Sequence, residues 1–119
     1  MEQKSALPRI VDAGSTEWGL HPRFAGILIK PLLTPADNAL ANVGMVRVPP
    51  GREVGRHRHP TQVETVYLLQ GQSVLTVGDS DMSLEAGQIV AIPIGIEHAL
   101  RNVGTEPVDL LAFFTPPIG

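Results

Sequence analysis

Short apolar runs, each closed by glycine, proline or a polar turn, recur along the whole chain. Strands are expected at 26–33, 42–48, 65–69, 73–77, 82–84, 88–92 and 108–114, with a further strand beginning at His98. Gly and Pro number 12 and 11, which together exceed the usual share of about 12%, and a chain interrupted this often holds few long helices. With the strand that carries His57 and one short strand in the first 25 residues, these make nine or ten short strands without a repeat or a linker, which predict an all-β fold, a single antiparallel jelly-roll β-barrel.

The N-terminal end lacks this pattern, because proline and glycine interrupt any sustained period there. We interpret residues 1–25 as a short arm and residues 26–119 as one barrel domain, since a chain of 119 residues can bury one modest core. Within the arm, Trp18 and Phe24 are expected to cover the barrel or a subunit interface rather than to contact a substrate. His21 is expected at the surface or behind a site, not as a metal ligand.

Composition excludes several classes of partner. A hydrophobic fraction of 43% with 18% charged residues is typical of a folded globular protein, and a net charge of −3 gives no reason to expect nucleic acid. No apolar run approaches the roughly 20 residues that a membrane span requires, and the first residues resemble no secretory signal. Because the chain has no cysteine, any bound metal must be held by nitrogen and oxygen. We therefore expect a cytoplasmic protein that binds neither nucleic acid nor membrane.

Candidate metal ligands gather in the segment Gly51–Gly71, GREVGRHRHPTQVETVYLLQG. His57 and His59 are two residues apart, and a strand directs residues i and i+2 to the same face, so both imidazoles can point at one spot. Glu64 has the wrong parity for one unbroken strand, but Pro60 favours a turn that would return Glu64 to the same interior. The segment therefore predicts three ligand-type side chains around one position.

A second segment completes a pair of motifs. The first motif has Gly51, His57, His59, Glu64 and Gly71, and the second has Gly87, Pro93, Gly95, His98 and Asn102. Together they match the paired motifs of the cupin superfamily at ten of ten fixed positions, so residues 51–102 resemble a small single-domain cupin. The resemblance implies a small β-barrel in which His57, His59, Glu64 and His98 hold one divalent transition metal ion.

This ligand set leaves the identity of the metal open. Three neutral imidazoles and one carboxylate form a nitrogen-rich site that accepts Fe, Mn, Ni, Cu, Co or Zn. An octahedral ion keeps two positions for water, substrate or dioxygen, whereas four ligands close a tetrahedral ion and make it structural. An open site can activate water, polarise a carbonyl or enolate oxygen, or bring dioxygen and substrate together at a redox metal.

Cupins carry many unrelated activities, so three hypotheses stay open. The leading one is an enzyme, a metal-dependent oxidoreductase of dioxygenase type that acts on an oxygen-bearing small molecule, with Glu64 detaching to act as a catalytic base. The second is a non-oxidative isomerase or lyase, in which Gln62, Arg47 or Arg101 could assist the metal. The third is a small-ligand-binding protein without turnover.

The resemblance also implies a homodimer, because small cupins pair in this way. Tyr67, Leu69 and the arm of residues 1–25 would be available for the contact. Tyr67 has the opposite parity to Glu64 on its strand, so it is not expected to serve as a catalytic acid.

Overall fold

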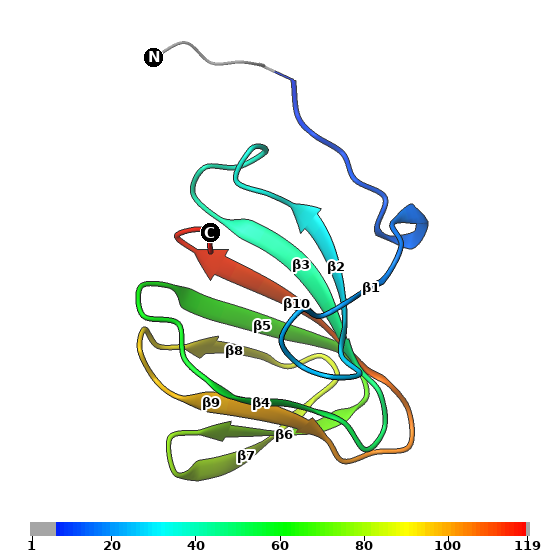
Figure 1. Ribbon diagram of the computed structural model, residues 1–119, viewed down its shortest axis with the longest axis vertical. Coiled ribbons are helices and arrows are strands. Elements are labelled where there is room, and N and C mark those ends of the chain that lie inside the picture. Colours follow the sequence, from blue (N-terminus) through cyan, green and yellow to red (C-terminus); the bar gives the residue numbers. More distant parts are fainter. Residues whose placement is uncertain (1–6, 119) are drawn as a thin grey trace.

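The computed structural model describes residues 7–118, and ten strands in two antiparallel sheets form most of this part (Figure 1). The six-stranded sheet has the order β1-β2-β3-β10-β5-β8, and the four-stranded sheet has the order β4-β9-β6-β7. The strands of the first sheet are β1 (Gly19–Leu20), β2 (Leu28–Leu33), β3 (Asn42–Val48), β10 (Val108–Thr115), β5 (Val63–Gln70) and β8 (Ile89–Ile92). Those of the second are β4 (Glu53–His57), β9 (His98–Asn102), β6 (Gln72–Val77) and β7 (Ser80–Glu85). A short helical turn, η1 (Ala13–Ser15), precedes β1. The all-β antiparallel jelly roll expected from the sequence is confirmed.

The core lies between the two sheets, and strand alternation decides which side chains enter it. On β5, Val66 and Leu68 are buried, and they pair in register with Ala112 and Leu110 of β10. Tyr67, between the two buried residues, belongs to the opposite face of the same strand. Glu64 has the parity of Val66, so the same alternation turns its carboxylate toward the interior.

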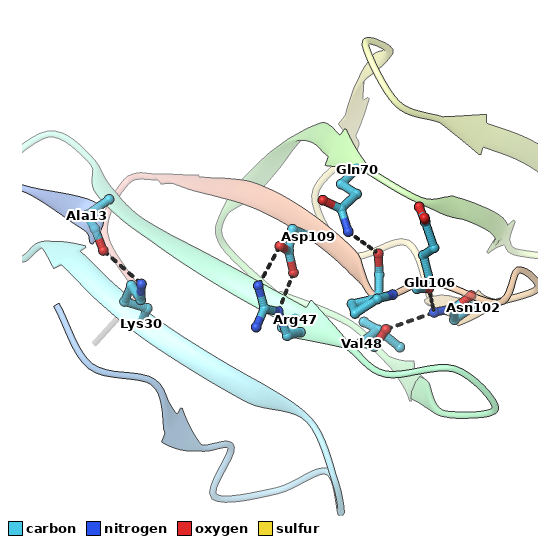
Figure 2. Close-up of polar contacts among 9 residues, drawn as sticks. Ala13, Lys30, Arg47, Val48, Gln70, Asn102, Glu106 and Asp109 are labelled. Carbon is cyan, nitrogen blue, oxygen red and sulfur yellow. Dashed lines mark hydrogen bonds and ion pairs between the residues drawn. The ribbon is translucent and has the colours of Figure 1, made fainter. Parts of the chain in front are cut away.

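Hydrogen bonds and cation–π contacts hold residues 13–18 against the six-stranded sheet. Arg47 Nε and Nη2 donate to the two carboxylate oxygens of Asp109 at 2.7 and 2.8 Å (Figure 2). The Trp18 ring lies 4.5 Å from Lys30 Nζ and 4.6 Å from the Arg47 guanidinium carbon, distances typical of cation–π contacts. Lys30 Nζ also donates to the carbonyl of Ala13 at 2.7 Å. Trp18 therefore covers the sheet.

Asn102, the last residue of the second motif, holds a turn in place. Its Nδ2 donates to the carbonyls of Val48 and Glu106 at 2.9 and 2.7 Å (Figure 2), and its Oδ1 accepts from the backbone N–H of Gly104 at 2.8 Å. The buried amide thus joins the end of β9 to the end of β3. This residue supports the fold of the barrel.

Among residues 7–118, no helix has the length and apolar character needed to cross a bilayer. The cytoplasmic location, the lack of a nucleic-acid partner and the homodimer stay predictions. Tyr67 and Leu69, expected at the subunit contact, are half-buried and exposed, respectively, in the single chain.

Candidate metal centre

The four residues with ligand-type side chains come from both sheets. His57 is the last residue of β4 and His98 the first residue of β9, and the two are register partners in the four-stranded sheet. Glu64 lies on β5 of the six-stranded sheet, and His59 lies in the connection between β4 and β5. The backbone N–H of Gly95 donates to the carbonyl of His59 at 2.9 Å, which ties the first motif to the second.

These four side chains converge on one position. One nitrogen of each histidine and one carboxylate oxygen of Glu64 all lie within 4.8 Å of one another. The ring centroid of His57 lies 4.2 Å from that of His98 and 4.9 Å from that of His59. Glu64 Oε1 lies 3.0 Å from His98 Nε2 and 3.4 Å from His59 Nε2. The atoms are thus close enough to share a single ion.

Backbone carbonyls fix the orientation of two of the rings. His57 Nδ1 lies 2.7 Å from the carbonyl of Gly55, and His98 Nδ1 lies 2.9 Å from the carbonyl of Ile96. A carbonyl accepts but cannot donate, so each Nδ1 carries a proton. With Nδ1 occupied in this way, Nε2 is the nitrogen available to a metal, as is usual for histidine ligands supported by a backbone carbonyl.

The surroundings of the third ring, that of His59, indicate whether a cation fits the site. His59 Nε2 is buried and has no hydrogen-bond partner within the described part of the chain. It lies within 3.4 Å of Glu64 Oε1, but the contact lacks hydrogen-bond geometry and is therefore electrostatic only. A buried polar atom without a partner is costly unless a ligand satisfies it. A divalent cation between these nitrogens and the Glu64 carboxylate would do so.

The electrostatics of the cluster also suit a cation. Burial alone would raise the pKa of Glu64, but its contacts with His59 and His98 outweigh burial and lower the pKa to about 2. Burial likewise opposes protonation of His98, but the bond to Glu64, the carbonyl of Ile96 and the charge of Glu64 together outweigh burial and raise the pKa of His98. Burial lowers the pKa of His57 and keeps this ring neutral. A metal that binds at His98 Nε2 therefore competes with a proton for this nitrogen.

The structure places His59 differently from the expectation. His57 and His59 were expected to share a strand face, but β4 ends at His57 and His59 lies beyond it. The two rings still approach each other, edge to face. Pro60 follows closely and lacks the backbone N–H that would continue the ladder.

The cluster opens into a cavity of about 640 Å³. Its walls are mainly apolar and include Phe24, Ile29, Val46, Val54, Val66, Leu75, Ile92, Leu100, Leu110, Ala112 and Phe114. Phe24 packs on His57 with ring centroids 5.3 Å apart, and Phe114 packs on His59 at 4.9 Å. Phe24 was expected to cover the barrel or a subunit interface, but it lines the cavity, and His21, expected at the surface or behind a site, lines the same wall.

Of the three residues expected to assist the metal, Gln62 lines the cavity. The expectation for Arg47 is wrong, because its guanidinium is bound to Asp109 and lies over Trp18, outside the cavity wall. Arg101 is also outside that wall and has its nearest carboxylate, that of Asp81, 3.8 Å away. Metal binding by the four clustered residues, and a role of Glu64 as a base, stay predictions.

Comparison with known proteins agrees with this architecture. The family model described as "Cupin domain" matches residues 44–114. The chain is 31% identical over 111 residues to "Polyketide synthase CurC" of Streptomyces cyaneus, covering 92% of this chain and 70% of that protein. It is 31% identical over 67 residues to an "Oxalate-binding protein" of Thermotoga maritima, covering 56% of this chain and 55% of that protein.

Solved structures share the fold. The crystal structure of a "predicted oxalate decarboxylase" from Thermotoga maritima superposes with a TM-score of 0.82 at 23% identity, over 91% of this chain and 99% of that one. At this identity the likeness concerns the fold alone. With the family match over most of the barrel and the paired motifs that meet inside it, the chain belongs to the cupin family.

Proposed function

We propose that this protein is a metalloenzyme that holds one divalent transition metal ion through His57, His59, Glu64 and His98. The observation that carries the proposal is the buried Nε2 of His59, which has no hydrogen-bond partner among residues 7–118 and lies with three other ligand-type atoms within 4.8 Å. The donor set fits Fe, Mn, Ni, Cu, Co or Zn and does not choose among them. When bound, such an ion supplies a Lewis acid, and a redox-active one also supplies electrons for chemistry with dioxygen.

The proposed substrate is a mainly apolar small molecule that carries oxygen. The cavity of about 640 Å³ is several times larger than a small dianion such as oxalate requires, and aliphatic and aromatic side chains form most of its wall. An aromatic or polyketide-like molecule matches this lining better than oxalate does. The similarity to a protein named as a polyketide synthase component supports the same class of substrate.

For the reaction, we propose a dioxygenase type, in which both atoms of dioxygen enter the substrate. Apart from the four clustered residues, the titratable side chains among the described cavity-lining residues are His21, Arg23 and Arg58. A reaction at a redox metal needs few acid–base groups from the protein, and this sparse set therefore favours it. Glu64 is ionised at neutral pH because its pKa is about 2, so it can accept a proton but holds it weakly.

The second candidate is non-oxidative, an isomerase or lyase reaction at a polarised carbonyl or enolate. Its specific support is His21, an imidazole in the cavity wall outside the ligand cluster, which could exchange a proton with a substrate. A ligand-binding protein without turnover is the remaining alternative, because one relative is named for binding oxalate.

Metal analysis and oxygen uptake test these alternatives. The protein would be purified without oxygen, its metal content measured, and oxygen consumption recorded with enols, catechols and thiols. Metal-dependent oxygen uptake supports the dioxygenase, turnover without oxygen supports the isomerase or lyase, and binding without product supports the third alternative.

A matched pair of variants tests the site itself. Glu64→Gln should lower the metal content of the purified protein, whereas Glu85→Gln, an exposed glutamate on β7, should leave it at the wild-type value. Equal metal content in both variants would contradict the proposed ligand set.

A further inference from the structure

The turn between β1 and β2 brings a histidine to the wall of the cavity. The backbone N–H of His21 donates to the carbonyl of Ile27 at 2.8 Å, and Ile27 is fully buried in the core. Gly26 has a φ of +77°, and the Arg52 side chain packs within 3.0 Å of where its Cβ would be. The turn is therefore anchored at both ends, and His21 and Phe24 line the cavity from it.

The hydrogen bonds of the His21 ring define its tautomer. Its Nδ1 accepts from the backbone N–H of Arg23 at 3.0 Å and from that of Phe24 at 3.3 Å. A nitrogen that accepts from two N–H groups carries no proton, so the proton of the neutral ring is on Nε2. Burial lowers the pKa of His21, and the charge of Arg23 acts in the same direction, so the neutral form is favoured.

The ring stands close to the candidate metal centre. The His21 and Phe24 ring centroids are 5.0 Å apart, and those of Phe24 and His57 are 5.3 Å apart. One aromatic ring thus separates His21 from a ligand residue of the cluster. Gln62, another polar residue of the wall, already donates from Nε2 to the carbonyl of Pro117 at 3.3 Å. Within residues 7–118, no hydrogen bond engages His21 Nε2.

We propose that His21 is a substrate-binding residue, whose Nε2–H donates a hydrogen bond to a carbonyl-type oxygen of the substrate. This inference rests on the proposed function and specifies its substrate. The molecule would carry one oxygen that approaches the metal centre and a second oxygen, beyond an apolar ring, that reaches His21. Phe24 would pack against the ring between them.

Two substitutions separate the substrate contact from the structural role of His21 in the turn. In His21→Asn, the side-chain oxygen can accept from the backbone N–H of Arg23, as in an Asx turn, but the distal donor is lost. In His21→Gln, the amide nitrogen can replace the distal donor, whereas the acceptor for the turn is displaced. If His21 only supports the turn, His21→Asn should bind the substrate as wild type does. If His21 Nε2–H binds the substrate, His21→Gln should retain substrate binding and His21→Asn should not.

The test uses two fluorescent phenols of similar size with Zn²⁺-loaded protein, which performs no redox chemistry. Umbelliferone has a lactone carbonyl at the end opposite its phenol, and β-naphthol lacks this carbonyl. Dissociation constants would be measured for wild type and both variants, together with metal content and thermal unfolding as checks of folding. We expect wild type to prefer umbelliferone by about fivefold, the value of one neutral hydrogen bond. His21→Asn should lose this preference, and His21→Gln should retain part of it.

The possible failures can be told apart. An unchanged preference in a folded, metal-loaded His21→Asn protein, or no preference in wild type, would overturn the role of His21. Binding of β-naphthol that is as strong without metal as with it, or no saturable binding of either phenol, would instead contradict the proposed function on which this role rests.

Discussion

His57 and His98 face each other across β4 and β9 with their ring centroids 4.2 Å apart, although they belong to separate motifs of the sequence. Glu64 reaches the same position from the opposite sheet and bonds to His98 Nε2 at 3.0 Å. An ion bound here would therefore connect the two sheets of the barrel. Its effect should extend beyond the site to the stability of the whole domain.

Metal binding should raise the melting temperature. An ion present at a hundred times its dissociation constant stabilises the folded state by about 2.7 kcal/mol, which corresponds to about 10 °C for a domain of this size. Differential scanning calorimetry of metal-free protein with added Zn²⁺ or Mn²⁺ measures the shift. Ca²⁺ is the control, because it prefers oxygen ligands and should leave Tm unchanged. An equal shift with Ca²⁺, or none with any transition metal, would argue against the site.

Loss of the Arg47–Asp109 pair should destabilise the fold without affecting the metal centre. Arg47→Ala leaves the carboxylate of Asp109, a residue only 8% exposed, without its two charge-assisted bonds and removes one cation from Trp18. We expect the free energy of unfolding to fall by about 2 kcal/mol. Arg101→Ala is the control, because its 3.8 Å contact with Asp81 is exposed and should contribute less than about 0.5 kcal/mol. Urea unfolding measures both, and equal losses would contradict the prediction.

The neutral state of His21 predicts a specific pH dependence. Burial lowers the pKa of His21 below its usual 6.5 in the folded protein, whereas the unfolded chain retains the usual value. Between the two values the unfolded state binds more protons, so the stability that His21 contributes is complete above about pH 6.5 and declines as the pH falls.

The comparison of wild type with His21→Asn isolates this effect, because Glu64 and His98 titrate in both proteins. Urea unfolding at about pH 7.5 and about pH 5.5 should show wild type losing stability relative to the variant on acidification. Parallel pH profiles of the two proteins would mean that His21 titrates alike in the folded and unfolded states.

Two glycines with similar backbone angles should respond differently to alanine. Gly71 and Gly87 have φ values of +96° and +88°, so either substitution incurs the cost of a left-handed residue, about 1 kcal/mol. A Cβ at Gly71 would also lie 2.7 Å from the carbonyl oxygen of Pro107 and 2.9 Å from Val108 Cα, whereas a Cβ at Gly87 would meet no atom of the described residues within 4 Å. Gly71→Ala should therefore cost about 1 to 3 kcal/mol more than Gly87→Ala. Similar unfolding midpoints for the two variants would contradict the close packing at Gly71.

Features that depend on local pattern were predictable from the sequence. The strand expected at 42–48 is β3, Asn42–Val48, and His98 is the first residue of β9 as expected. The convergence of His57, His59 and Glu64 was predictable from their short spacing and the turn at Pro60, although His59 lies beyond β4 and not on a strand face shared with His57. Such constraints act between near neighbours, so a single sequence contains them.

Features that depend on distant packing were not predictable in the same way. Phe24 and His21 reach the cavity because the chain turns at Gly26 and β1 pairs with β2, a contact that no local period indicates. Arg47 was expected beside the metal but lies on the outer face of the sheet, bound to Asp109. Its place between Val46, which lines the cavity, and the buried Val48 is a signal that could have indicated the outer face.

The most direct test of the metal centre is X-ray absorption spectroscopy on protein loaded with one equivalent of Zn²⁺. We predict a first shell of nitrogen and oxygen at about 2.1 Å with the multiple-scattering signature of three imidazoles. A spectrum with one imidazole or none, or with a shell of water alone, would contradict the assignment of His57, His59 and His98 as ligands of a single ion.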